Sequence, residues 1–64
     1  MKNRIRVLRA EYRLSQAELG EKVGVSRQAI NAVETEKHDP SLALAFKIAD
    51  VFDVKVEDVF DPKG

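Results

Sequence analysis

Two helix-start signals, with a glycine between them, constrain the fold of this chain more than any other feature. Ser15 is followed three residues later by Glu18, the pattern of a capping box, in which the two side chains satisfy backbone N–H groups at a helix start. Ser26 is a second N-cap candidate, and a glycine can end the preceding helix in the left-handed conformation without steric cost. These signals predict two short helices joined by a tight turn, the first from Gln16 to a stop at Gly24 and the second over about Arg27–Thr35.

The apolar pattern of this segment indicates how the two helices pack. Apolar residues stand where two steeply crossing helices must touch, which is the geometry of a helix-turn-helix: Ala17, Leu19, Val23, Val25, Ile30 and Val33. A small residue at Ala17 or Gly20 would let the second helix approach the first closely. Glycine inside a helix costs about 1 kcal/mol relative to alanine, and close packing would explain why it is tolerated.

Helical periodicity continues through the rest of the chain. We expect one helix over about Lys2–Tyr12 with Ile5, Leu8 and Tyr12 on one stripe. After the break at Pro40, Ser41 caps a helix over about Leu42–Phe52, whose stripe is Leu42, Ala45, Ile48, Ala49 and Phe52, and a short last helix spans about Val56–Phe60. The sequence therefore predicts an all-α fold of five helices, in a single domain covering residues 1–64.

Composition excludes several classes of site. The 64 residues include no cysteine and a single histidine, His38, so neither a disulfide framework nor a metal site is expected, and no cofactor is implied. No apolar run approaches the roughly 20 residues that a bilayer span needs, and no signal-peptide pattern opens the chain, so a cytoplasmic protein without membrane contact is the default expectation. Formal net charge is zero, but residues 1–38 carry +3 and residues 39–64 carry −3. This asymmetry favours an anionic partner for the first part, although a solvated mixed surface would also account for it.

The exposed side of the second helix of the unit carries chemistry suited to base edges. Arg27 can bond guanine O6 and N7, while Gln28 or Asn31 can bond adenine N6 and N7, and Ala32 can touch a thymine methyl. An ordinary polar face chosen for solubility is the alternative, but such a face would more often carry Glu and Lys. We therefore predict that these four residues contact bases of double-stranded DNA.

The segment "LSQAELGEKVGVSRQAINAVE", followed by "DPSLALAFKIADVFDV", resembles the lambda-repressor-like, or XRE-type, family of helix-turn-helix regulators. The resemblance extends from "IRVLR" to "VEDVF", and the cap, the turn glycine, "SRQAI" and "PSL" stand in the family order. It implies five helices and a transcriptional regulator, usually a repressor, that binds DNA as a homodimer on a palindromic operator.

The resemblance also implies roles for single residues. Phosphate contacts are expected from the start of the first helix of the unit, from the start of the second, and from the loop after it: Gln16, Ser26, Thr35 and Lys37. Arg9 and Glu34 match a pair that forms an ion bridge between helices in relatives, although both could instead be free surface charges. Such a bridge would fix the orientation of the DNA-reading helix more than it would add net stability.

Three positions depart from the family pattern. Relatives often have glycine where Glu36 stands, and a left-handed residue there would cost about 1 kcal/mol, so we expect another conformation for this loop. Glu36 and Asp39 also place carboxylates near the expected phosphate path. Lys55 stands where relatives often have Ser or Thr, so the last helix is expected to begin without a side-chain cap.

Two other classes of function compete with DNA binding. An enzyme would need an activated nucleophile or paired carboxylates in a cleft, but each serine is better explained as a helix cap, so we expect no catalysis and no small-molecule substrate. A protein-interaction module is the stronger competitor, because Phe46, Val51 and Phe60 lie beyond or beside the main apolar stripe. We expect these three residues to form a homodimer interface, unless Phe60 simply closes the core. The ordered pattern runs to the end of the chain, so we expect no attached effector domain.

Overall fold

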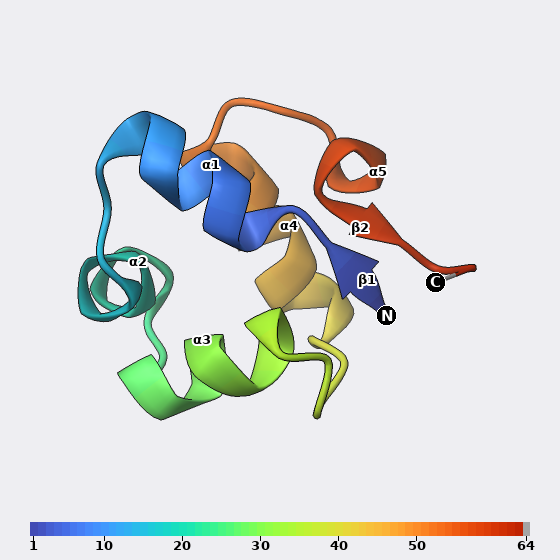
Figure 1. The fold of residues 1–64 in the computed structure, drawn as a ribbon, viewed down its shortest axis with the longest axis horizontal. Helices are drawn as coiled ribbons and strands as arrows, with labels where there is room; N and C mark the ends of the chain where they lie inside the picture. The colour runs from blue at the N-terminus through green and yellow to red at the C-terminus, as the bar shows by residue number, and fades with distance from the viewer. Residues whose placement is uncertain (64) are drawn as a thin grey trace.

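The computed structural model describes residues 1–63, which form five helices and one two-stranded antiparallel sheet (Figure 1). The elements in chain order are β1 (Lys2–Asn3), α1 (Ile5–Tyr12), α2 (Gln16–Val23), α3 (Arg27–Glu34), α4 (Leu42–Val51), α5 (Val56–Val59) and β2 (Phe60–Asp61). The prediction of five helices with a helix-turn-helix at the second and third is confirmed. The boundaries of α3 and α4 fall within one residue of those predicted.

The junction between α2 and α3 is built by the predicted caps. The Ser15 hydroxyl accepts a hydrogen bond from the Glu18 backbone N–H at 3.0 Å, and the Ser15 N–H donates to the Glu18 carboxylate at 2.9 Å. Gly24 has φ 79°, and the Ser26 hydroxyl accepts from the Ala29 N–H at 3.1 Å. The view of Figure 1 runs almost along the axis of α2, whereas α3 lies across it, so the two helices cross steeply.

Gly20, rather than Ala17, permits the close approach of the turn to α2. A Cβ atom at Gly20 would lie 2.6 Å from the backbone oxygen of Val25, which is far inside van der Waals contact. Ala17 is exposed, because the first turn of α2 faces solvent on that side. The two small residues therefore have different roles, which their positions in the sequence alone did not separate.

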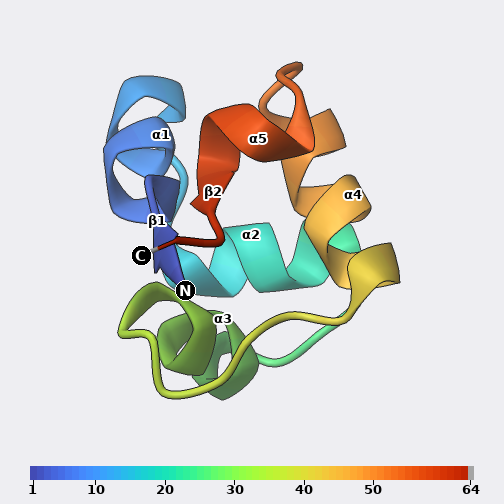
Figure 2. The ribbon, with the colours of Figure 1, turned by 90° about the vertical axis from the view of Figure 1, so that its right-hand side faces the viewer.

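The short sheet was not predicted, and it shortens the first helix. Lys2 pairs with Asp61 and Asn3 pairs with Phe60, so the start of the chain is extended and α1 begins only at Ile5. Figure 2 shows β1 and β2 side by side. Each strand has only two residues, which is too few to show the alternation of apolar and polar residues typical of a strand. The helical pattern that follows was therefore extended back to Lys2 in the prediction.

One aliphatic core, completed by two phenylalanines, holds the helices together. Its buried members are Ile5, Leu8, Leu19, Val23, Ile30, Val33, Ala45, Ile48, Ala49, Phe52, Val59 and Phe60. Two residues predicted on inward stripes are instead exposed. Leu42, in the first turn of α4, is 72% exposed, and Tyr12 is 48% exposed because its ring meets only the edge of the core at Phe52.

The loop after α3 contains a left-handed residue at Glu36, although the sequence analysis predicted another conformation. Glu36 has φ 65°, in the left-handed region. This turn directs the Lys37 and His38 N–H groups back to the carbonyl oxygen of Ala32, at 2.9 Å and 3.2 Å. These hydrogen bonds offset a backbone cost of about 1 kcal/mol.

The start of α5 agrees with the sequence expectation. Lys55 supplies no side-chain cap, and the Asp58 carboxylate instead accepts a hydrogen bond from the Lys55 N–H at 3.1 Å. Among residues 1–63, no helix has both the length and the apolar character needed to cross a membrane.

Candidate nucleic-acid interface

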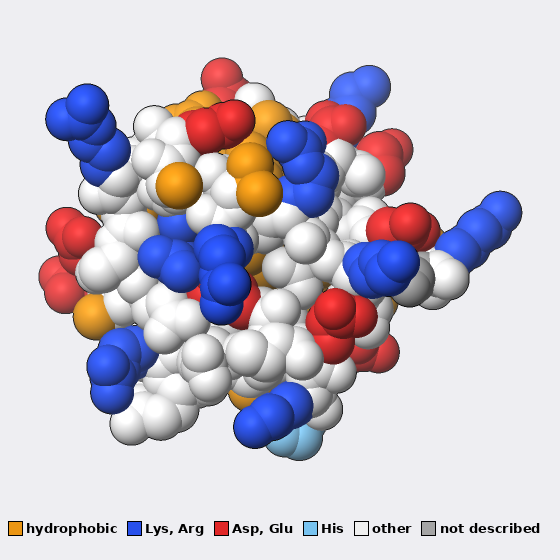
Figure 3. All heavy atoms as spheres, viewed as in Figure 1, with side chains coloured by type: hydrophobic (Ala, Val, Ile, Leu, Met, Phe, Trp, Pro, Cys, Tyr) orange, Lys and Arg blue, Asp and Glu red, His pale blue; other side chains and the backbone are white. Residues whose placement is uncertain are grey.

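The predicted base-reading residues occupy the exposed side of α3, beginning in its first turn. Arg27, Gln28 and Asn31 are exposed, and together with Gln16 from α2 they line a shallow hollow of about 300 Å³. Ala32 is half-buried. Figure 3 shows that the surface around α3 is largely uncharged in this view, with basic side chains toward its two ends.

Gln16 joins the start of α2 to two residues of α3. Its Nε2 group donates one hydrogen bond to the Asn31 Oδ1 at 3.1 Å and another to the Glu34 Oε2 at 2.7 Å. A primary amide has two N–H donors, so both hydrogens of this side chain are engaged. The atom of the Gln16 amide left free is its oxygen, which can only accept.

Arg9 and Glu34 form the ion pair that the resemblance implied. The Arg9 Nη2 lies 2.9 Å from the Glu34 Oε1, and the two side chains are 16% and 2% exposed. Arg9 also donates from Nη1 to the Leu14 carbonyl oxygen at 2.9 Å. The guanidinium therefore ties α1 both to the loop before α2 and to the last turn of α3.

The remaining residues predicted to contact phosphate lie at the two ends of α3. Ser26 is exposed at the start and Lys37 is exposed in the loop beyond the end. The Thr35 hydroxyl donates back to the Asn31 carbonyl oxygen at 2.8 Å, so its proton is occupied within the helix. The loop also carries the carboxylates of Glu36 and Asp39. The Asp39 carboxylate accepts a hydrogen bond from the Met1 ammonium group at 3.1 Å.

Asn3 is a positioning residue that the sequence argument missed. Its Nδ2 donates to the Val33 carbonyl oxygen at 2.9 Å, and its Oδ1 accepts from the Ile5 N–H at 3.1 Å. The side chain thus begins α1 and holds the last turn of α3. An asparagine two residues before an apolar stripe was the available signal, because short polar side chains commonly bond to backbone at helix starts.

The residues predicted for a dimer interface do not form one surface. Phe46 is 54% exposed, whereas Phe60 is 4% exposed and belongs to the core. The Phe60 side chain therefore closes the core, which was the alternative to an interface role. Val51 is partly buried and lines a separate hollow with Tyr12 and Leu14. Helical geometry explains the separation, since residues 46 and 51 point to different sides of α4.

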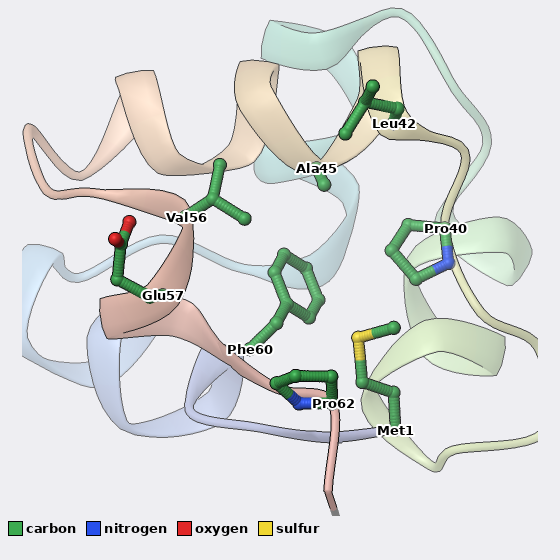
Figure 4. Close-up of a pocket in the computed structure, with 8 residues that line it drawn as sticks. All are labelled: Met1, Pro40, Leu42, Ala45, Val56, Glu57, Phe60 and Pro62. Atoms are coloured by element: carbon green, nitrogen blue, oxygen red, sulfur yellow. The ribbon is translucent and has the colours of Figure 1, made fainter.

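A more continuous apolar surface lies beside Phe46. Leu42 stands one turn earlier on α4, at a spacing that places both on one face. Next to Leu42 is a groove of about 500 Å³, and Figure 4 shows α4, α5 and both ends of the chain contributing to it. The groove is lined by Met1, Pro40, Leu42, Ala45, Val56, Glu57, Phe60 and Pro62.

The steep crossing of α2 and α3, the glycine-permitted turn and the exposed polar side of α3 define a helix-turn-helix transcriptional regulator. Comparison with known proteins agrees, since a helix-turn-helix family profile matches residues 5–59. The chain belongs to this family, in its lambda-repressor-like, or XRE-type, branch.

Relatives and solved structures support this assignment. An uncharacterized HTH-type transcriptional regulator of Methanocaldococcus jannaschii is 57% identical over 60 residues, covering 94% of this chain and 91% of the relative. The N-terminal DNA-binding domain of SinR from Bacillus subtilis has a TM-score of 0.81 at 34% identity, covering 94% of this chain and 88% of that one. The P22 c2 repressor, in complex with a synthetic operator, has a TM-score of 0.81 at 30% identity, covering 84% of this chain and 82% of that one.

Proposed function

We propose that this regulator binds double-stranded DNA with α3 in the major groove, where Arg27, Gln28, Asn31 and Ala32 contact bases. The single observation that carries the proposal is the grouping of exposed Arg27, Gln28 and Asn31 with Gln16 on one face, braced from below by a buried ion pair. A helix held this rigidly can present hydrogen-bonding groups to base edges without first being ordered.

Phosphate contacts on both sides of α3 would hold it in register. Ser26 and Lys37 are exposed and suited to this role. Gln16 would contribute through its backbone N–H, which is free in the first turn of α2, because both side-chain hydrogens are engaged. Thr35 would contribute only if its hydroxyl released the Asn31 carbonyl oxygen.

A homodimer on a palindromic operator is the second part of the proposal. Two copies related by a two-fold axis would place two α3 helices about one DNA turn apart. The exposed pair Leu42 and Phe46, beside the apolar groove, offers the surface for this contact. It keeps Phe46 from the predicted interface and has Leu42 in place of Val51 and Phe60. Dimerisation would also double the number of specific contacts, which a chain of zero formal charge needs.

Repression is the activity that fits these parts. A regulator bound to an operator that overlaps a promoter excludes other proteins from it, and the structural likeness to the P22 c2 repressor on its operator supports this mode. Such a protein works where the chromosome is, hence the proposed cytoplasmic location. No catalysis belongs to the proposal, since Ser15, Ser26 and Ser41 all serve as helix caps.

Selection of bound sequences from a random pool of duplex DNA tests the proposal. We expect the unaltered protein to enrich one short sequence, and Gln28→Ala to lose preference at one base pair by about 1–3 kcal/mol. Lys37→Ala is the matched control, because loss of a phosphate contact weakens binding to all sequences alike and lowers the salt slope by about 1. A pool without enrichment would overturn the DNA-reading proposal, and an unchanged preference in Gln28→Ala would remove that residue from the reading face.

A further inference from the structure

His38, the single histidine of the chain, belongs neither to the core nor to the predicted base-reading side of α3. It is exposed in the loop after α3, next to Lys37, which is proposed to contact phosphate. The backbone N–H groups of Lys37 and His38 both donate to the Ala32 carbonyl oxygen, at 2.9 Å and 3.2 Å. The two side chains therefore start from one turn that is anchored to α3.

The His38 side chain projects on the side of the molecule where α3 lies. Figure 3 shows the histidine, in pale blue, beside a basic side chain at the lower edge of this view, beyond the end of α3. The C-terminal end of a helix carries partial negative charge and favours a nearby cation. A protonated imidazole is thus compatible with this place in the fold.

The charged groups nearest to His38 balance one another. Within the loop, Glu36 and Lys37 are exposed and of opposite charge. The Asp39 carboxylate is paired with the Met1 ammonium group at 3.1 Å, so it is already engaged by another cation. The loop surface therefore becomes net positive only when His38 is protonated.

The elements that flank the loop do not supply a free carboxylate in its place. At the end of α3, Glu34 is paired with Arg9 at 2.9 Å and also accepts from Gln16. In β1, the charged side chain is the cation Lys2. A positive charge on His38 is therefore available to an external anion.

We propose that His38 is a further phosphate ligand of this regulator and contacts the DNA backbone in its protonated form. The inference rests on the proposed function. Histidine is the side chain whose charge changes between about pH 8 and 5. Protonated imidazole donates from both ring nitrogens, and a charged donor binds a phosphate oxygen more strongly than a neutral one does. DNA binding then takes up a proton at this loop and strengthens as the pH falls.

This contact changes affinity rather than sequence preference, because phosphate contacts carry no direct sequence information. Each phosphate neutralised by the protein steepens the dependence of log affinity on log salt by about 0.9. The salt dependence should therefore change with pH together with the affinity. A residue that only supported the loop would leave the salt dependence unchanged.

Titration of two duplexes, the enriched sequence and an unrelated one, at about pH 7.5 and about pH 5.5 tests the inference. At about 0.1 M salt we expect both duplexes to bind roughly fivefold tighter at the lower pH for each bound copy, with the salt slope steeper by about 1. His38→Gln never carries the charge and should lose both effects. His38→Lys carries it at both pH values, so it should bind at the higher pH as tightly as the unaltered protein does at the lower.

A matched control moves the histidine elsewhere. Lys47→His, added to His38→Gln, places an imidazole at an exposed position of α4, outside the predicted interface, and should restore no pH dependence. Urea unfolding at both pH values establishes that each variant is folded.

Three results would overturn the inference. They are an unaltered protein whose affinity does not change with pH, a change that persists in His38→Gln, and a change that returns with Lys47→His. A random pool without enrichment would instead defeat the proposed base reading, while titration of the unrelated duplex would still decide the role of His38.

Discussion

Gly20 decides how closely the turn before α3 can approach α2. A methyl group at this position would meet backbone rather than a flexible side chain, because the Val25 oxygen lies 2.6 Å from the Cβ site. Gly24 differs, since its added Cβ would meet nothing within 4 Å and its requirement is the positive φ of 79°. Two glycines four residues apart are thus needed for two separate physical reasons.

Gly20→Ala is expected to destabilise the protein although it improves helix propensity. The propensity gain is about 1 kcal/mol, but displacing the turn backbone costs about 1–3 kcal/mol or more. We therefore expect a net loss of roughly 1 kcal/mol in urea unfolding, together with weaker DNA binding because α3 shifts. Gly24→Asn is the control, since asparagine tolerates the left-handed conformation. A Gly20→Ala protein more stable than the unaltered one would show that the turn has room.

Glu18 makes the stability of the α2 cap sensitive to pH. The hydrogen bond from the Ser15 backbone N–H, then that with the Ser15 side chain, lowers the pKa of the Glu18 carboxyl, with a smaller contribution from Lys22. A carboxyl whose pKa is lower in the folded than in the unfolded protein stabilises the fold above its unfolded pKa. That contribution is lost as pH falls through the folded pKa.

Glu18→Gln separates this titration from the cap itself. Glutamine can still accept from the Ser15 N–H but does not ionise. We expect the unaltered protein to be the more stable of the two near neutral pH, and the difference to shrink at an acidic pH, as the carboxyl protonates through its lowered folded pKa. Urea unfolding at both pH values measures it, and a difference that does not change with pH would contradict the assignment.

At the scale of elements, the last turn of α3 is held by contacts from α1, α2 and the start of the chain. Glu34 accepts from Arg9 and Gln16, while Asn3 holds the Val33 carbonyl oxygen in the last turn. Apolar packing at Ile30 and Val33 supplies the burial and sets which side of α3 faces the core. The polar contacts add hydrogen bonds that hold the end of the helix in that orientation.

Arg9→Met should therefore destabilise the protein. A second substitution, Glu34→Met, should restore stability without restoring DNA affinity. Removing Arg9 leaves the Glu34 carboxylate, 2% exposed, without its cation, at a cost of about 3 kcal/mol. Arg9→Met with Glu34→Met replaces the pair by apolar groups and should recover most of that loss. DNA affinity should stay reduced in the double variant, because Gln16 has lost its acceptor at residue 34, one of its two contacts with α3. Urea unfolding measures the stability and DNA titration measures the affinity. If the double variant recovered both fully, the Arg9–Glu34 pair would contribute only packing and would not position α3.

At the scale of the whole molecule, the two ends of the chain close one side of the fold. β1 and β2 pair, and the Arg4 N–H donates to the Val59 carbonyl oxygen at 2.8 Å beside them. This closure buries Phe60 and forms the floor of the apolar groove next to Leu42. The exposed apolar stripe of α4 then remains as the surface proposed to meet a second copy.

Phe46→Glu is expected to abolish dimerisation while preserving the fold. Phe46 is 54% exposed, so its loss should change the free energy of unfolding by no more than about 0.5 kcal/mol. Sedimentation equilibrium should show a monomer. Binding to a palindromic site should lose cooperativity and become no tighter than binding to two independent half-sites. Lys47→Glu, on another side of α4, is the charge control. A Phe46→Glu protein of unchanged assembly would locate the dimer contact elsewhere.

Local chemistry determined the helices of this protein, and it could be read from the sequence. Ser15, Ser26 and Ser41 cap helices as predicted, and Gly24 ends α2 in the left-handed conformation. Each signal involves residues within a few positions of one another, so it acts before any tertiary contact forms. The order of caps and apolar positions was enough for the helix-turn-helix between residues 16 and 34.

Contacts between residues distant in the chain were decided only by the tertiary structure. The pairing of β1 with β2, the hold of Asn3 on α3 and the exposure of Leu42 depend on which elements become neighbours. A clear case is Asn31, whose amide is oriented by the Gln16 side chain, which also donates to Glu34. Sequence determines which hydrogen-bonding groups a helix carries, whereas packing determines which of them remain free, because a donor or acceptor is available only where no neighbour has engaged it.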